Sequence, residues 1–513
     1  MVATAIAFSC SALAWADGSV TYASITEPSS LGLHQEASGA TFIPLQAMYE
    51  PLMRLDGQMN LLPGLAEEWR QIDDTTYEIK LRSDVTFHSG NPFTAEDVKK
   101  TFEWHLDPDA PGYAAAYLSP ISEMEVVDDL TLIIRLEEPY GPFLHALSMP
   151  HTAISDMTLF EKIGADGLRT QPSGTGPFML DGWDRGAELR LKAFPDYWGG
   201  EPAIDGLTFR FMPEATARAI ALETGEIDIA ETVAAPDIPR LEANEDITVV
   251  DAFELRAVLW LINGHAAPFD DVSVRAALGH SIDYGLIIDS ILGSAAKRLA
   301  GFVPEEAFGS APFSYAFDPQ KAEALLEEAG WTRNAQGIFE KDGQPLEFTH
   351  VSGGHIAQEV QVAEAIQALL REFGILMDIE VVERVVHTST MFNHAQNYPD
   401  GPKPDFGSTQ WDHGIRTGDA SVALDPIFTC GGARNFTQFC NPEYDTLIRT
   451  AVSGAPDEER RAAYRKAQQI LLDGAAALPL WQPRITMASR ARVENLNVTP
   501  TRVVYFDEIT LSD

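Results

Sequence analysis

Strand-like and helix-like hydrophobic patterns follow one another along the whole 513-residue chain. In residues 75–82, TTYEIKLR, the apolar side chains of Tyr77 and Ile79 alternate with polar ones, which is the period of a half-buried strand. Residues 94–102, TAEDVKKTF, have a helical period instead. Interspersed patterns without an internal repeat or a low-complexity linker predict an α/β protein. Because the chain is too long for one ordinary core, we expect two or three domains.

His88 and Ser89 lie between these two patterns, close to several acidic residues, and this combination invites comparison with a hydrolytic site. Thr94 is a good helix N-cap, and Glu96 and Asp97 in the first turn suit the positive end of the helix dipole. His88 and Ser89 then fall on a strand end and a turn, and no third catalytic partner is indicated. The segment is therefore predicted to be structural.

The charge balance excludes two classes of partner. The chain has 36 Lys and Arg against 76 Asp and Glu, a formal net charge of −40. This charge repels nucleic acid phosphates and anionic lipid surfaces, so neither is expected as a partner. The charge itself does not identify a ligand.

The first sixteen residues resemble a secretory signal peptide. An apolar run ends in Ala14-Trp15-Ala16, an A-x-A cleavage pattern, although the segment has no Lys or Arg. A buried N-terminal helix and lipidation at Cys10 are alternatives, but the residues before Cys10 match a lipoprotein signal poorly. No later stretch approaches the ~18 apolar residues of a membrane span. We therefore expect residues 1–16 to be removed and the protein to be periplasmic.

Two cysteines remain after this cleavage, Cys430 and Cys440, on either side of GGARNFTQF. In an exported protein, this spacing favours one disulfide closing a glycine-rich loop. A metal site would need further ligands, and no histidine lies between the two cysteines. We expect the disulfide.

Several segments, in order, resemble the solute-binding proteins of peptide- and nickel-type ABC importers. They are YEPLMRLDGQMNLLPGLAEEW (49–69), YEIKLRSDVTFHSGNPFTAEDV (77–98), GTGPFMLDGW (174–183), PDYWGGEPAIDGLTFRF (195–211), ALETGEIDIAE (221–231), NGHAAPFDDVSVRAALGHSID (263–283), AEALLEEAGW (322–331) and LPLWQP (478–483). The resemblance covers nearly all of the chain after the signal segment. It implies a two-lobed periplasmic binding protein fold with mixed sheets and a hinge that the chain crosses twice.

The same segments can be interpreted without the family. Residues 175–193 read as a hairpin, and residues 319–331 as an amphipathic helix ended by Gly330. Residues 214–230 read as a short helix with Ala217, Ile220 and Ala221 inward, followed by a buried strand.

The family's architecture predicts domain boundaries. We place the two hinge crossings near Asp251–Arg256 and near Trp481–Ile485. The expected units are a first lobe over 17–254 with an inserted subdomain at about 49–168, a second lobe over 255–483, and a C-terminal return to the first lobe over 484–513.

The residue patterns predict no catalytic or metal-binding motif. The chain has no G-x-S-x-G elbow and no H-E-x-x-H helix. The loose histidine groups, His350 with His355 and His387 with His394 and His413, lack helical ligand spacing. The sequence thus predicts neither enzyme activity nor a cofactor, although a pair of carboxylates brought together by the fold, as in a glycosidase, stays open.

A ligand site is predicted in residues 403–428, KPDFGSTQWDHGIRTGDASVALDPIF, where a strand ends in polar and aromatic residues. The expected ligand-binding residues there are Trp411, Asp412, His413, Arg416 and Asp419. A solvated loop with one core tryptophan is the alternative.

Peptide-binding relatives carry Trp-x-x-Asp-x-x-[Asp/Glu]-Pro in this place, and that aspartate holds the peptide amino group. This chain has Gly414 three residues after Trp411, so the resemblance moves the carboxylate to Asp412 or Asp419, or removes it.

The matching edge of the first lobe is LSMPHTAIS (147–155), which puts Met149 and His151 where some nickel-type relatives carry an arginine. The expected function is capture of a peptide, opine, sugar or similar small solute by a monomer and delivery to an ABC permease with its ATPase subunits. A sensor or chaperone-like binding protein, and less so a secreted hydrolase, are the alternatives.

Overall fold

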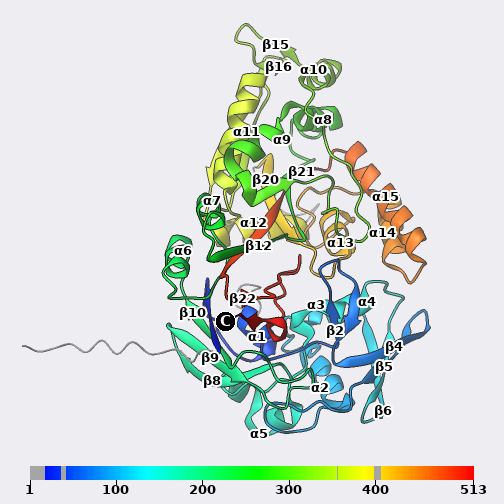
Figure 1. Cartoon of the computed structure of the whole chain (residues 1–513). Helices are drawn as coiled ribbons and strands as arrows, with labels where there is room; N and C mark the ends of the chain where they lie inside the picture. Colours follow the sequence, from blue (N-terminus) through cyan, green and yellow to red (C-terminus); the bar gives the residue numbers. More distant parts are fainter. Residues whose placement is uncertain (1–17, 36–41, 355, 398–405, 513) are drawn as a thin grey trace, which may run out of the picture.

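The computed structural model describes residues 18–35, 42–354, 356–397 and 406–512. It confirms the predicted two-lobed α/β fold, and its largest sheet runs through both lobes (Figure 1). We call the lobe built on β1 and β8–β12 the lower lobe, and the lobe built on β13 and β18–β20 the upper lobe. The predicted signal peptide, residues 1–16, lies outside the described residues.

The lower lobe is built around β1 (Ser19–Ser24), whose residues after Ser19 are all buried. This strand pairs in parallel with β10 (Gly206–Phe211) and β11 (Ile229–Ala230). Beyond β10, β9 (Glu188–Ala193) and β8 (Phe178–Asp184) form the predicted antiparallel hairpin. The C-terminal segment, residues 491–512, packs on the same hydrophobic core.

The C-terminal segment joins the lower lobe through ring packing and a short sheet. Phe506 lies against Tyr22 of β1 and Phe209 of β10, with ring centroids 5.9 and 5.5 Å apart. The two-residue strands β22 (Val493–Glu494) and β23 (Thr510–Leu511) pair antiparallel.

A separate four-stranded sheet extends the lower lobe. Its order is β4 (Ala66–Asp73), β5 (Thr76–Leu81), β7 (Thr131–Leu136) and β6 (Ile121–Asp128), and α2 (Ala95–His105) shares its hydrophobic core. The two central strands, β5 and β7, bury alternate side chains against this core, which accounts for the two-residue period in residues 75–82.

The stretch around His88 is structural, as the sequence predicted. Thr94 and Asp97 form a capping box at the start of α2. The ring of His88 uses both nitrogens on backbone groups, and burial lowers the pKa of His88 to about 4, so the ring is neutral at pH 7. The hydroxyl of Ser89 donates to Asp156 at 2.5 Å. These contacts tie the loop to neighbouring segments.

The upper lobe is built around β13 (Arg256–Ile262), which pairs antiparallel with β20 (Ser408–Gly414). β18 (Glu347–Ser352) continues the sheet in parallel, followed by β19 (Leu376–Val381). Trp260 is fully buried between this sheet and its covering helices. These helices are α8 (Val272–Ser281), α10 (Pro319–Glu328) and α11 (Glu359–Phe373).

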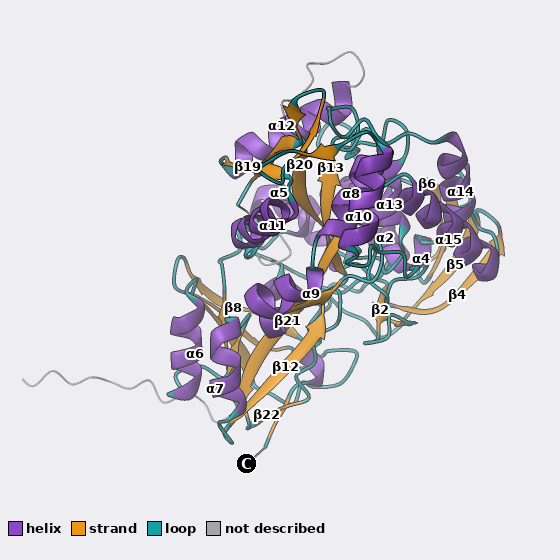
Figure 2. Ribbon diagram, turned by 90° about the horizontal axis from the view of Figure 1, so that it is seen from above, coloured by secondary structure: helices purple, strands orange, loops and turns teal. Residues whose placement is uncertain are grey.

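One long strand, β21 (Ala477–Arg490), belongs to both lobes. Its first part pairs with β13 of the upper lobe, and its second part pairs with β12 (Ile247–Phe253) of the lower lobe (Figure 2). The chain passes from β12 into β13 through Glu254 and Leu255 alone. The two lobes are thus connected by neighbouring extended segments.

The inward face predicted for α6 (Ala215–Glu223) is right for Ala221, which is buried, and wrong for Ala217 and Ile220, which are exposed. Ile220 is 52% exposed, whereas Arg218, Ala219 and Leu222 are buried. Arg218 has the inward position because its guanidinium donates to the backbone carbonyls of Glu231 and Thr232, at 2.7 and 2.8 Å.

No helix in the described part of the chain is both long and apolar enough to cross a membrane.

Candidate functional site

A cavity of about 810 Å³ lies between the two lobes. Both lobes, the segment between β12 and β13, and the C-terminal segment line it. The lining residues are Ile25, Phe42, Gln46, Tyr113, Met149, Pro150, His151, Glu254, Leu255, Arg256, Arg384, Asp412, Gly414, Arg416, Pro500, Thr501 and Arg502.

The lower-lobe wall of this cavity contains both residues predicted at the first-lobe edge. Met149 precedes the short 3-10 helix η2 (Pro150–Thr152), and His151 lies within it. The ring of His151 lies 4.2 Å from that of Phe42 and 4.6 Å from that of Tyr113, between centroids. This wall therefore borders the cavity with mutually tilted rings and with Met149, whose side chain is almost fully buried.

The upper-lobe wall is formed by one face of β20 and the residues after it. Side chains alternate along a strand, so Asp412 and position 414 face the cavity while Trp411 and His413 face the other way. Arg416 joins Asp412 in lining the cavity. Of the five ligand-binding residues predicted in this segment, the structure brings two, Asp412 and Arg416, to the cavity.

Trp411 packs behind the wall. Its ring contacts those of Phe436, His387 and Phe392, with centroids 4.6, 5.8 and 6.2 Å away. Trp411 lies within β20 and does not follow its end, because the strand continues three residues further to Gly414. The ring consequently supports the wall from within the upper lobe.

His413 is also part of the upper-lobe interior. Its Nε2 lies 2.5 Å from the carbonyl oxygen of Val422, and its Nδ1 lies 3.2 Å from the guanidinium of Arg434. Burial, and after it the charge of Arg434, lowers the pKa of His413 to about 3. The ring is neutral at pH 7, so Nε2 donates to Val422 and Nδ1 accepts from Arg434.

Asp419 is already engaged by a buried arginine. Its carboxylate lies 2.5 Å from the guanidinium of Arg460 on α15 (Asp457–Asp473) and accepts from Tyr464 at 2.5 Å. Only 6% of the Asp419 side chain is exposed. The position expected to hold a ligand cation thus holds a structural ion pair, which no local pattern could indicate.

A chain of ion pairs extends along one side of the cavity. Arg256 contacts the carboxylates of both Glu254, at 2.9 Å, and Asp412. Arg502 lies 3.6 Å from Glu254. Burial opposes ionisation of Glu254, but Arg256 and Arg502 outweigh it and hold the pKa of this carboxyl below its ordinary value. Glu254 is therefore ionised at pH 7, and the carboxylates of Glu254 and Asp412 both already face an arginine.

Arg416 and Arg384 extend the positive side of the cavity. The guanidinium of Arg416 lies 6.0 Å from the ring centroid of Tyr113, across the lobe boundary. Arg384 begins α12 (Arg384–Asn397) and is exposed. Sequence reasoning missed Arg256, Arg384 and Arg502, because they lie in three distant segments and share no motif.

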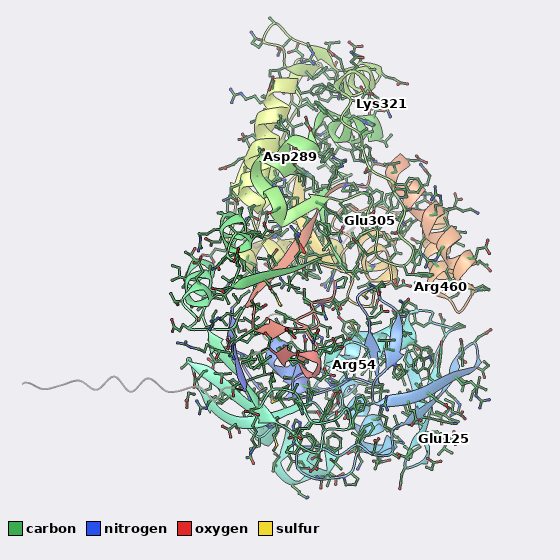
Figure 3. All side chains as sticks on the ribbon, viewed as in Figure 1. Arg54, Glu125, Asp289, Glu305, Lys321 and Arg460 are labelled. Carbon is green, nitrogen blue, oxygen red and sulfur yellow. A yellow bond between two sulfur atoms is a disulfide. The ribbon has the colours of Figure 1, made fainter. Side chains whose placement is uncertain are left out.

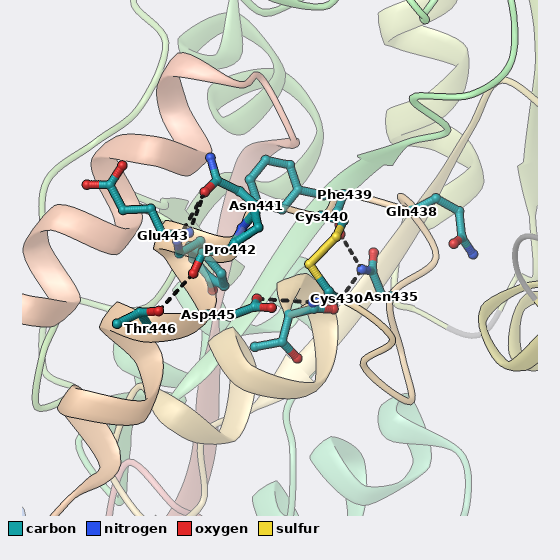
Figure 4. Close-up of a disulfide and its surroundings, with 12 residues drawn as sticks. Cys430, Asn435, Gln438, Phe439, Cys440, Asn441, Pro442, Glu443, Asp445 and Thr446 are labelled. Carbon is teal, nitrogen blue, oxygen red and sulfur yellow. Dashed lines mark hydrogen bonds between the residues drawn. A yellow bond between two sulfur atoms is a disulfide. The ribbon is translucent and has the colours of Figure 1, made fainter.

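Cys430 and Cys440 form a disulfide, with Cα atoms 4.5 Å apart (Figure 4). The side chain of Asn435 donates to the carbonyl of Thr429, just before the closed loop, and to that of Phe439 within it, at 2.9 and 2.6 Å. The loop carries Phe436, which packs on Trp411, and Arg434, which contacts His413. It therefore supports the upper-lobe wall from behind.

No group of three or more His, Cys, Asp or Glu side chains in the described ranges could hold a metal ion. The residues that line the cavity form aromatic, apolar and charged walls around it. This arrangement suits reversible binding of a small polar molecule.

A family model for bacterial extracellular solute-binding proteins, family 5, matches residues 60–435. The di/tripeptide-binding protein 2 of Pseudomonas aeruginosa is 29% identical over 489 residues, 89% of this chain and 87% of that protein. The glutathione-binding protein GsiB of Shigella flexneri is 26% identical over 473 residues, 91% and 89% of the two chains. The crystal structure of NikA from Brucella suis with Fe(III)-EDTA superposes with a TM-score of 0.85 at 26% identity, covering 97% of this chain and all of that one.

Proposed function

The chain belongs to family 5 of the bacterial extracellular solute-binding proteins, and from this membership we propose that it captures a short peptide-like solute between its lobes. As a solute-binding subunit of an ABC importer, it presents that solute to a membrane permease driven by ATPase subunits. The relatives named for di/tripeptides and for glutathione support the solute class.

The observation that carries the proposal is the cavity of about 810 Å³ between the lobes. Small-molecule sites occupy roughly 300–1,000 Å³. The cavity has a ring-lined wall from the lower lobe and a charged wall from the upper lobe. Such a space accommodates a short solute and contacts it from both sides.

The proposed site keeps four of the seven ligand-binding residues predicted from the sequence and adds residues that the sequence did not indicate. Met149, His151, Asp412 and Arg416 contact the solute directly. Trp411, His413 and Asp419 act behind the wall by fixing its position. The residues added from the structure are Tyr113, Glu254, Arg256, Arg384 and Arg502.

We place the hinge where β12 passes into β13 and where β21 changes its pairing partner. The lobes would then span 17–254 and 255–483, with 484–513 returning to the first lobe and a subdomain at about 49–168. Continuous pairing of β21 with both lobes supports this placement, because a strand can twist without losing its ladder.

The protein is proposed to bind its solute without chemical conversion. Its relatives are binding proteins, and the described residues lining the cavity comprise two acids and one histidine without a nucleophile–base pair. Incubation of pure protein with peptides, glycosides and esters should leave them intact. Cleavage in proportion to protein, surviving repurification, would show an enzyme.

The family description as extracellular supports export. We propose that residues 1–16 are the signal peptide and that the released chain acts as a monomer in the periplasm. Mass spectrometry of the secreted protein should find Asp17 at its N-terminus, and a mature chain beginning elsewhere contradicts this part.

A thermal-shift screen of short peptides tests the function directly. A ligand that binds only the folded protein stabilises it by RT ln(1 + [L]/Kd), about 2.7 kcal/mol at a hundredfold excess over Kd. A true solute should raise Tm and decrease the radius of gyration in solution scattering, because the hinge closes on it. If no peptide of two to five residues raises Tm, the peptide-like class is wrong.

A further inference from the structure

We infer that the solute is a dianion, held through two carboxylates, and that no carboxylate of the described cavity is reserved for a solute amino group. The inference rests on the proposed function and specifies the chemistry of the same site. It also separates this protein from relatives in which an aspartate takes the amino group.

The first support is the charge of the cavity. Among the described residues that line it, four are arginines and two are acids, so the formal charge is +2 with histidine neutral. The whole chain has a net charge of −40. The cavity is therefore positive although the chain as a whole is negative. When the lobes exclude water from the cavity, its excess of two positive charges must be neutralised, and two carboxylates of the solute do this.

The second support is the engagement of both acids by the protein itself. One guanidinium, that of Arg256, contacts Glu254 and Asp412 together, and Arg502 approaches Glu254 from the C-terminal segment. Exposed fractions of 25%, 10% and 21% for the side chains of Arg256, Glu254 and Asp412 mean that water replaces these contacts poorly. An ammonium group drawn to Asp412 would compete with a guanidinium already in place.

The third support is the pair of arginines with no acidic partner in the described part of the chain. No ion pair involves Arg384 or Arg416 there, although both line the cavity. Arg416 faces Tyr113 across the lobes, with 6.0 Å between its guanidinium carbon and the ring centroid. A planar guanidinium can hold a carboxylate through two parallel hydrogen bonds. Two such groups match two carboxylates.

The remaining acid in the segment after β20 is not available either. Asp419 is held by Arg460 and Tyr464 inside the upper lobe, and Gly414 provides no side chain. The upper-lobe wall therefore offers a solute positive charge and backbone groups, with no free carboxylate.

Four dipeptide probes separate the two recognition modes in a calorimetric experiment: Ala-Glu, Ala-Gln, N-acetyl-Ala-Glu and N-acetyl-Ala-Gln. The acidic pair has two carboxylates and the amide pair has one, while acetylation removes the ammonium charge. We expect acetylation to change Kd less than threefold and the change from Glu to Gln to weaken binding at least tenfold. Binding that requires the free amine and is indifferent to Glu or Gln overturns the inference.

The variants Arg384→Gln and Arg416→Gln identify the groups responsible. Each should remove most of the preference for Glu over Gln without creating a preference for the free amine. Arg169→Gln, an exposed residue of the lower lobe away from the cavity, makes the same charge change and should leave the preference intact. An unchanged preference in both cavity variants also overturns the inference.

A solute-independent reporter keeps this inference distinct from the peptide proposal. Thr501 lines the cavity, and Thr501→Cys in the chain from residue 17 onward introduces the only thiol outside the disulfide. Excess positive charge should lower the pKa of this thiol below about 8.5, and Arg416→Gln should raise it again. A lowered thiol pKa with no binding of any probe supports the anion-binding cavity and removes the peptide-like class. A thiol pKa that is not lowered, and is equal in both proteins, overturns the inference.

Discussion

The amide of Gly141 in the lower lobe donates a hydrogen bond to the carbonyl of Val452 in the upper lobe, at 2.8 Å. Val452 ends α14 (Pro442–Val452), and Arg460 in the next helix lies over the same part of the lower lobe (Figures 1 and 3). The lobes therefore meet at a second place, apart from the strands that connect them. Contacts made here must break when the lobes separate.

Met59 forms the apolar part of this second contact. It lies in the turn between β2 (Met53–Leu55) and β3 (Leu61–Pro63), with a left-handed φ of 67° that glycine adopts without strain. Asp56 holds the turn by accepting from the amides of Gln58 and Asn60, both at 2.8 Å. Met59 is nevertheless only 8% exposed, in a core cluster otherwise drawn mostly from the upper lobe.

We expect Met59→Gly to favour the open form of the solute-free protein. The substitution removes the buried side chain between the lobes and also relieves roughly 1 kcal/mol of backbone strain, so the lower lobe should stay folded. Apparent affinity falls in proportion to the closed fraction, about tenfold if the substitution lowers that fraction tenfold relative to wild type. Solution scattering should show a larger radius of gyration. Gln58→Ala, exposed in the same turn, should change neither quantity; equal radii for Met59→Gly and wild type would exclude this role.

Arg256→Gln should destabilise the protein. It leaves the carboxylates of Glu254 and Asp412 close together without the guanidinium between them, and removing one partner of a buried ion pair costs roughly 3 kcal/mol or more. Urea unfolding measures the loss. Arg135→Gln, which breaks exposed pairs with Glu123 and Glu125, should cost less than about 1 kcal/mol. Similar losses of unfolding free energy in the two variants would show that the ion pairs of Arg256 stabilise the protein no more than exposed ones do.

Trp411→Ala should affect stability more than solute contact. The ring fills space between Phe392 and Phe436, and removing a packed aromatic side chain costs about 3 kcal/mol. Since the ring lies behind the cavity wall, calorimetry should find a loss of affinity below about tenfold at a temperature where the variant is folded. Trp411→Phe should recover most of the stability. A large affinity loss with unchanged stability would instead place the ring against the solute.

His413 should make the protein sensitive to acid. Its pKa is about 3 in the folded protein, against about 6.5 when unfolded, so the unfolded chain takes up a proton first. The stability contributed by neutral His413 is complete above pH 6.5 and is lost as pH falls toward 3, by up to about 1.4 kcal/mol per pH unit. His413→Gln should have a shallower decline in unfolding free energy over this window. Parallel curves for the two proteins would contradict the assignment.

Local structure followed from local residues. The strand over residues 75–82, the capping box of Thr94 and Asp97, and the hairpin at Gly186 all depend on groups a few positions apart, where period and cap chemistry act. Ile220 shows the limit of this reasoning. The helical period alone does not place the inward face, because Arg218 found backbone carbonyls that lie beyond its own helix.

The two-lobed fold and the cavity positions of Met149 and His151 were accessible through ordered motifs resembling a known family. The residues that make up the charged wall of the cavity could not be predicted in this way. Arg256 and Asp412 are 156 residues apart, and Asp419 and Arg460 are 41 apart. Whether an acid in residues 403–428 meets a solute or an arginine depends on which strand lies beside it. Alternation along β20 then sends Asp412 to the cavity and Trp411 away from it, a choice made by sheet register that no residue in the segment specifies.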